Sequence, residues 1–114
     1  MTRAPGNGRN RDERREDALR PCRYLGYDRD SLARYLMQRC AFELAETQLR
    51  RAIWLNPFEP AFKHHLALCL YRQNKLQEAR DWARKALEQK DEPNTRDLLD
   101  LIQHKLDEER GTHG

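Results

Sequence analysis

The sequence predicts an all-α fold: a short α-solenoid of two helix–turn–helix repeats, with a capping helix after them and a flexible arm before them. Two copies of one pattern carry this prediction, because residues 32–53 and 66–87 match at a spacing of 66 − 32 = 34 residues. A unit of this length holds two helices of about a dozen residues each and two short turns. Composition agrees, since 36% of the 114 residues are charged, which suits helices with solvated outer faces.

Identical residues recur across the two copies. They pair as Leu32 with Leu66, Ala33 with Ala67, Leu36 with Leu70, Ala45 with Ala79, Arg50 with Arg84, and Ala52 with Ala86. The alanines let neighbouring helix axes approach closely, and Leu, Ile and Phe side chains three or four positions away fill the space between them. The repeat therefore predicts one helical hairpin stacked on another.

The chain divides into an arm and a helical domain. Residues 1–24 form the arm, which contains almost no large apolar residue and is expected to be disordered at least through residue 10. Acids and bases are interspersed from residue 11 to residue 19, and this stretch is expected to become helical only when it docks. The domain spans residues 25–110, with repeats at 28–59 and 60–93 and a capping helix at 94–109.

Turn and capping residues place the five helices. They are expected at residues 29–39, 42–55, 60–74, 76–90 and 94–109. Asp28 or Asp30 suits the N-cap of the first helix and Asn94 or Thr95 that of the last, because their side-chain oxygens can accept from the free N–H groups of a first turn. Pro60 is favourable in the first turn of the third helix.

The strings LARYLMQRCAFELAETQLRRAIWLNP and LALCLYRQNKLQEARDWARKALEQKDEP resemble the consensus of the tetratricopeptide repeat (TPR) family, from its leucine–small pair to its closing proline. The resemblance covers roughly two thirds of the chain and implies a right-handed stack whose first helices line a concave groove. It is specific for a fold and weak for a function.

Two departures from the TPR pattern affect the turns. Pro93 lies two residues later than the spacing from Pro57 predicts (57 + 34 = 91), so the turn into the last helix is expected to be longer. Cys40 and Asn74 occupy the place of the usual turn glycine. Asn tolerates a left-handed conformation but Cys does so poorly, so the first internal turn is expected to be distorted.

The resemblance also implies the residues of the groove. They are Arg34, Met37, Gln38, His64, His65, Leu68, Tyr71 and Arg72, with Asp30, Ser31, Ala61, Asp97, Leu101 and His104 beside them. A surface of this mixed character suits an extended peptide or a partner helix. Alternatively, the chain's own segment with Tyr24, Leu25 and Tyr27 fills the groove. The carboxylate clamp that one TPR subgroup uses for chaperone tails is absent, because its places carry Asp30, Arg34, His65 and Ala61.

Two tryptophans call for different interpretations. Trp54 matches Glu88 in the second copy and, with Phe58 and Phe62, predicts an aromatic patch on the convex side or at the turn between repeats. This patch is either an interface anchor or a cover for the end of the hairpin and the arm. Trp82 lies on the inner side of its helix and is expected in the core.

All of the net charge lies in the arm. Residues 1–24 hold seven arginines and four acids (7 − 4 = +3), whereas the remaining chain balances 15 basic against 15 acidic residues. The arginines predicted to bind a partner are Arg9, Arg11, Arg14, Arg15 and Arg20. Guanidinium groups suit carboxylates and phosphates, so the arm is expected to dock on an acidic protein surface or on nucleic acid. A solvated tail whose acids blunt its field is the alternative.

No catalytic, cofactor or metal site is predicted. His65 and Cys69 lie at i and i+4, but a structural zinc needs four ligands and the chain has no CxxC or HxxxH pair. The three cysteines lack framework spacing, which favours free thiols in a reducing compartment. No apolar run approaches the ~20 residues of a membrane span, so a cytoplasmic location is expected.

These observations predict a non-enzymatic scaffold, adaptor or small subunit that binds a protein or peptide partner within a larger assembly. It would use the groove, the aromatic patch and the arginine arm. A nucleic-acid-associated protein whose arm contacts phosphates is the alternative, and self-association stays open.

Overall fold

The computed structural model describes residues 21–113, and within them the chain forms five α-helices and no strand. The helices are α2 (Tyr27–Gln38), α3 (Phe42–Leu55), α4 (Pro60–Arg72), α5 (Leu76–Gln89) and α6 (Pro93–His113). The predicted all-α fold is confirmed. No helix in this part of the chain combines the length and hydrophobicity needed to cross a membrane.

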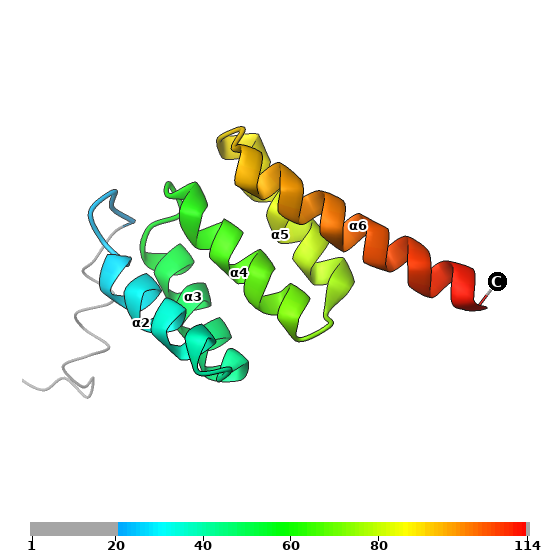
Figure 1. Cartoon of the computed structure of the whole chain (residues 1–114). Coiled ribbons are helices and arrows are strands. Elements are labelled where there is room, and N and C mark those ends of the chain that lie inside the picture. Colours follow the sequence, from blue (N-terminus) through cyan, green and yellow to red (C-terminus); the bar gives the residue numbers. More distant parts are fainter. Residues whose placement is uncertain (1–20, 114) are drawn as a thin grey trace, which may run out of the picture.

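The helices are stacked in chain order as antiparallel neighbours (Figure 1). Each helix packs on the next one, and α4 also contacts α2 and α6. The helices α2, α4 and α6 therefore form one layer, while α3 and α5 form the second. An ion pair of 3.2 Å between Arg50 and Glu78 joins the two helices of the second layer.

The repeated small residues allow the helices to approach closely. Seven alanines are at most 1% exposed: Ala33, Ala45, Ala52, Ala67, Ala79, Ala83 and Ala86. Larger apolar side chains fill the space between them, and Leu49, Leu66, Leu70 and Ile102 are fully buried. The predicted packing of alanine against leucine and isoleucine at helical spacing is what the core shows.

The two internal turns have the same geometry, so the predicted distortion of the first turn is wrong. Cys40 has φ 62° and Asn74 has φ 64°. In the first turn the N–H groups of Cys40 and Ala41 donate to Met37 and Leu36 at 2.9 Å, and the residues 34 positions later make the same two bonds at 2.9 Å. Both turns are Schellman motifs, and these hydrogen bonds hold Cys40 in the left-handed conformation despite its Cβ.

The start of α2 differs from the prediction, because neither Asp28 nor Asp30 is its cap. Gly26 occupies the N-cap position with φ 90°, and the aspartates lie in the first helical turn. A Cβ on Gly26 would meet Phe62 Cε2 at 2.8 Å and the Ala52 carbonyl oxygen at 3.0 Å. A glycine is required here because the chain both turns left-handed and passes close to α3 and α4.

Residues 21–27 are fastened to the turn between the hairpins. The Cys22 N–H donates to the Leu55 carbonyl at 3.1 Å, and the Asn56 side-chain amide donates to the Leu25 carbonyl at 3.1 Å. Tyr27 donates its hydroxyl to Glu59 at 2.7 Å. Leu25 and Tyr27 thus pack on this turn, whereas Tyr24 is 85% exposed.

A buried lysine also contacts the turn between the hairpins. Lys63 is 8% exposed, and its ammonium group donates to the Pro57 carbonyl and to Gln89 Oε1, both at 2.7 Å. Burial, and then the nearby Lys85, lower the pKa of Lys63. The bonds tie the turn between the hairpins to the end of α5.

The last helix is longer than predicted at its C-terminal end. It begins at Pro93, a favourable first-turn residue, and continues to His113 instead of residue 109. The turn before it spans residues 90–92, against 56–59 before α4, so the predicted longer turn is wrong. Thr95 does not cap it, because its side chain is buried and bonded to His64 at 2.9 Å. The sequence after Leu106 contains no proline that would end the helix earlier.

Candidate interaction surface

The predicted groove residues lie along α2 and α4. Met37, His64, His65, Leu68 and Tyr71 are half-buried, and Arg34, Gln38 and Arg72 are exposed. Two of the three exposed side chains already have partners. Arg34 pairs with Asp30 at 3.2 Å, and the Arg72 guanidinium lies 5.0 Å from the centre of the Phe42 ring.

His65 joins α2 to α4 through a buried carboxylate. Its Nδ1 lies 2.6 Å from Oδ1 of Asp30, which is 5% exposed and also pairs with Arg34. A buried carboxylate costs much free energy unless it is paired and hydrogen-bonded, and these two partners supply both. His65 therefore acts as a cross-link between the hairpins.

His64 makes the corresponding link between α4 and α6. Its Nδ1 is hydrogen-bonded to Thr95, whose side chain is 3% exposed. Burial, and then the neighbouring His65, lower the pKa of His64, so the neutral imidazole is favoured. Both predicted groove histidines are thus engaged in holding the first layer of helices together.

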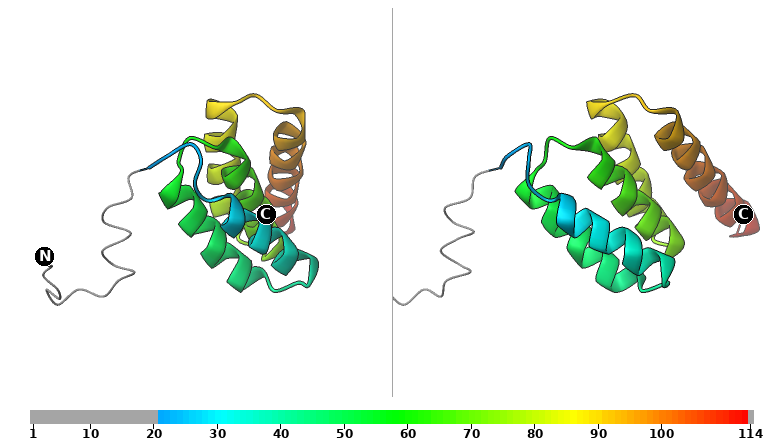
Figure 2. Two further views of the ribbon diagram at one scale, coloured as in Figure 1. Left: turned by 90° about the vertical axis from the view of Figure 1, so that its left-hand side faces the viewer. Right: turned by 60° about the vertical axis from the view of Figure 1, so that its left-hand side comes forward.

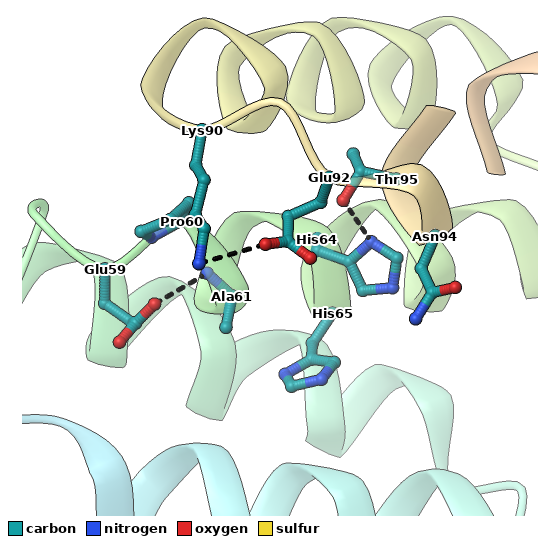
Figure 3. A pocket seen from close by; sticks show the side chains of 9 residues that line it. All are labelled: Glu59, Pro60, Ala61, His64, His65, Lys90, Glu92, Asn94 and Thr95. Atoms are coloured by element: carbon teal, nitrogen blue, oxygen red, sulfur yellow. Dashed lines mark hydrogen bonds and ion pairs between the residues drawn. The ribbon is translucent and has the colours of Figure 1, made fainter. Parts of the chain in front are cut away.

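A cavity of about 300 Å³ lies beside these histidines, where α4 and α6 begin and α5 ends (Figure 3). Its lining residues are Glu59, Pro60, Ala61, His64, His65, Lys90, Glu92, Asn94 and Thr95. Figure 3 shows the Lys90 ammonium between the carboxylates of Glu59 and Glu92. Lys90 pairs with Glu92 at 3.0 Å, and the hydrogen bond to Glu92 raises the pKa of Lys90. One ammonium group thus lies among two carboxylates in this cavity.

Cys69, which lies four residues after His65 and was weighed as a metal ligand, is in the core. It is fully buried and its thiol donates to the Phe42 carbonyl at 3.1 Å. Burial raises the pKa of the Cys69 thiol, which keeps it protonated. In the described residues no group of three or more His, Cys, Asp or Glu side chains could hold a metal ion.

The predicted aromatic patch does not form as one unit, and its third member was wrongly placed. Trp54 is 51% and Phe58 44% exposed, but Phe62 is fully buried. Phe62 is buried because Gly26 and Tyr27 at the start of α2 pack on its ring, with the Tyr27 ring centre at 5.0 Å. Trp54 lies under the Arg51 guanidinium at 4.9 Å.

Trp82 occupies a position between core and surface. Its side chain packs against the core cluster but is only partly buried. The Lys85 ammonium lies 4.4 Å from the centre of its ring and covers the outer side. Trp82 therefore packs against the core as predicted, but it is not fully buried.

Exposed apolar residues are concentrated in the first hairpin and the segments beside it. Eight large apolar side chains are exposed in the part of the chain that the structure describes. They are Tyr24, Tyr27, Leu32, Tyr35, Leu44, Trp54, Phe58 and Leu101, so that only Leu101 lies beyond residue 58. The two hairpins share a pattern but differ in which apolar positions are covered.

The repeat shows why these residues are exposed. Leu66 is fully buried because α3 covers this side of α4, whereas its counterpart Leu32 is 44% exposed. Further along the same side, Cys69, Gln73, Lys75 and Glu78 all contact α3. Their counterparts 34 residues earlier are Tyr35, Arg39, Ala41 and Leu44. With Leu32, these four residues form the side of the first hairpin that faces away from the second, here called the open face.

The first hairpin, α2 and α3, forms one end of the stack of helices (Figure 2), and the open face is the side of this hairpin that faces away from the second. Tyr35 is 53% and Leu44 62% exposed. The Arg39 guanidinium lies 5.4 Å from the centre of the Tyr35 ring. This surface was not predicted from the sequence, although the match of Leu32 to Leu66 indicates it. In the described structure only the second copy has a hairpin before it, so the equivalent leucine of the first copy is left uncovered.

Glu46 shows how the equivalent side of the second hairpin is covered. It accepts from Gln73 at 3.0 Å and Lys75 at 3.1 Å, and pairs with Arg50 at 2.8 Å. Burial favours the protonated acid, but these hydrogen bonds outweigh it and lower the pKa of Glu46. An ionised carboxylate of α3 thus binds the end of α4.

The predicted basic arm residues lie outside the described residues: Arg9, Arg11, Arg14, Arg15 and Arg20. Their binding role stays a prediction from the sequence. Comparison with protein-family models, curated proteins and solved structures finds no match to this chain.

Proposed function

We propose that this chain is a short right-handed α-solenoid of the TPR type that acts as a non-catalytic protein-docking scaffold, as an adaptor or as a small subunit of a larger assembly. The observation that carries the proposal is the open face. Leu32, Tyr35 and Leu44 are exposed on it, while the equivalent Leu66 is fully buried under α3.

Helical repeats need a polar outer face at their ends to stay soluble alone. The first hairpin has apolar side chains there, and contiguous exposed apolar surface is typical of interaction sites. An aromatic and an arginine side chain accompany the leucines, and these two residue types are enriched at interaction hot spots. The open face therefore has the composition of a buried interface.

The other predicted surfaces have secondary roles in this proposal. Met37, Leu68 and Tyr71 of the groove could contact a peptide. The groove histidines and Arg34 are already engaged in contacts within the chain. Trp54 offers an exposed ring on the outer side of α3. The arginine arm would add a salt-dependent attraction to an acidic partner surface.

Copurification of the tagged full-length chain from its native cell tests the proposal. Three forms are compared: the natural sequence, the double variant L32E/L44E, and the control L101E, which makes one such substitution at an exposed leucine of α6. We expect a stoichiometric protein companion with the natural sequence and with L101E, and its loss with L32E/L44E at unchanged helicity by circular dichroism.

Two results would contradict the proposal. The companion could persist with L32E/L44E, which would remove the open face from the interaction. Alternatively, nucleic acid could copurify in place of protein, with absorbance at 260 nm and an affinity that falls steeply with salt. That result would favour the phosphate-binding arm.

A further inference from the structure

We infer that the open face binds an amphipathic helix of a partner protein, which lies on α2 as α3 lies on α4 and places a carboxylate against Arg39. The inference rests on the proposed docking function and names the class of partner. It follows from the internal repeat, because the second hairpin shows what covers this side when a cover is present.

The helix that covers α4 has a definite pattern. The Phe42 carbonyl accepts from Cys69 of α4, and the Glu46 carboxylate accepts from Gln73 at the C-terminal end of α4. Leu49 and Ile53 follow at 49 − 42 = 7 and 53 − 42 = 11 positions after Phe42, and both pack in the core with Leu66. Apolar residues at i, i+7 and i+11 with an acid at i+4 form one helical stripe.

The open face keeps the apolar half of that recognition. Leu32 of the open face repeats Leu66, which is fully buried in the second hairpin, and Leu36, which packs against the core, repeats the fully buried Leu70. Leu32 is exposed and Leu36 partly so. A helix that covered α2 as α3 covers α4 would remove Leu32 from water, at about 25 cal/mol for each Å² of apolar surface buried.

The polar contacts of this side have their positive charge at a different position in the two copies. Gln73 donates to Glu46 as a neutral amide, whereas its counterpart is Arg39. Arg39 stacks on Tyr35, and no ion pair is found for it within residues 21–111. A guanidinium at this place forms a stronger, charge-assisted bond with a carboxylate than an amide does. Lys75, the second donor to Glu46, has the uncharged counterpart Ala41, so the open face offers a carboxylate one positive charge at Arg39 where the second hairpin offers one at Lys75.

The chain's own arm lacks the side chains for this role. Residues 1–20 contain only Met1 and Leu19 as large apolar residues. The chain joins the domain at Cys22, which is bonded to Leu55 at the end of α3, whereas Leu44 lies in its first turn. Leu55, where the arm meets the domain, and Leu44 of the open face are thus separated by about eleven residues of helix, or ~16 Å, along α3.

A fluorescent peptide with the sequence of residues 41–56 provides a probe, because it carries the stripe and the acid at natural spacing. Its binding to the full-length chain is followed by fluorescence anisotropy. We expect saturable binding that weakens about fivefold with R39E, as reversal of one exposed ion pair predicts. The control R84E makes the same charge change on the outer side of α5 and should leave the affinity unchanged.

A charge swap separates a specific pair from a general charge effect. A second peptide carries E46R in the same sequence, and R39E should bind it about as tightly as the natural pair binds. Failure of the swap, equal binding by L32E, or no saturable binding would overturn the inference. So would light scattering that shows a dimer which L32E dissociates, because a second copy would then be the occupant.

The copurification experiment distinguishes failure of the helical-partner inference from failure of the proposed docking function. A companion that is lost with L32E/L44E, together with a peptide that does not bind, would leave the docking scaffold standing and overturn only the helical partner. A companion that persists with L32E/L44E would overturn the docking function on which the inference rests.

Discussion

Cys40 and Asn74 lie 34 residues apart and share one backbone conformation, with φ angles of 62° and 64°. Each closes a Schellman motif with two backbone hydrogen bonds of 2.9 Å. The same turn is therefore built from a residue that tolerates the left-handed region and from one that does not.

Replacement of Cys40 by glycine should stabilise the protein. A non-glycine residue in the left-handed region costs about 1–2 kcal/mol, and the greater freedom of an unfolded glycine offsets part of the gain, so we expect an increase of about 1 kcal/mol. Urea unfolding measures it. Asn74→Gly is the matched comparison and should gain less, because asparagine adopts this conformation more easily. No gain at Cys40 would mean that its conformation carries no strain.

Gly26→Ala should destabilise the protein by about 2 kcal/mol or more, because φ is 90° and the new Cβ would meet Phe62 and the Ala52 carbonyl within 3.0 Å. Gly111→Ala is the control. It lies in α6 with nothing within 4 Å of the added atom, so it should raise stability slightly through helix propensity. Equal effects in thermal unfolding would contradict the close approach at Gly26.

Asp30→Ala should cost about 1–3 kcal/mol in the free energy of unfolding, because it leaves the half-buried His65 without its partner. Asp28→Ala removes an exposed carboxylate from the same helical turn and should cost at most about 0.5 kcal/mol. Chemical denaturation of both variants tests the cross-link. Similar losses would show that the charge at the start of α2 matters and the link to α4 does not.

Stability should fall in mild acid because of His64. Burial, and then His65, lower its folded-state pKa below the ordinary value of 6.5, while Glu92 opposes this shift. The unfolded chain therefore binds the proton more tightly, so the contribution is fully present above pH 6.5 and is lost as pH falls through the folded-state pKa. Unfolding curves of His64→Asn should show a weaker decline as pH falls below 6.5. An unchanged decline would assign the effect to other groups.

Sequence periodicity predicted the helices well because each has an apolar stripe and a local end signal. The predicted span of the second helix agrees with α3 (Phe42–Leu55), and the other starts lie within two residues of the structure. Alanine spacing also predicted the core. The ends of α2 and α6 were less predictable: Gly26 begins α2 because of a contact with Phe62, which lies 36 residues away.

Surface roles were harder to predict than helices. Phe62 was assigned to an exposed patch, but only the three-dimensional packing of Tyr27 on its ring shows that it is buried. The groove histidines were placed correctly along α4, yet their bonds to Asp30 and Thr95 join helices that local sequence does not relate. Charge and periodicity describe a residue's own helix, whereas function depends on what covers it.

The stacked arrangement also has a kinetic consequence. Every helix pair in contact is adjacent or one helix apart in the chain, so contacts are local and folding should be fast. Each end can then open without the other, and amide hydrogen exchange should be slowest in α4, which contacts all four other helices. A segment bound on α2 would slow exchange first in the helix that is otherwise free to fray. Slower amide exchange in the first hairpin would thus indicate that a partner is bound to it.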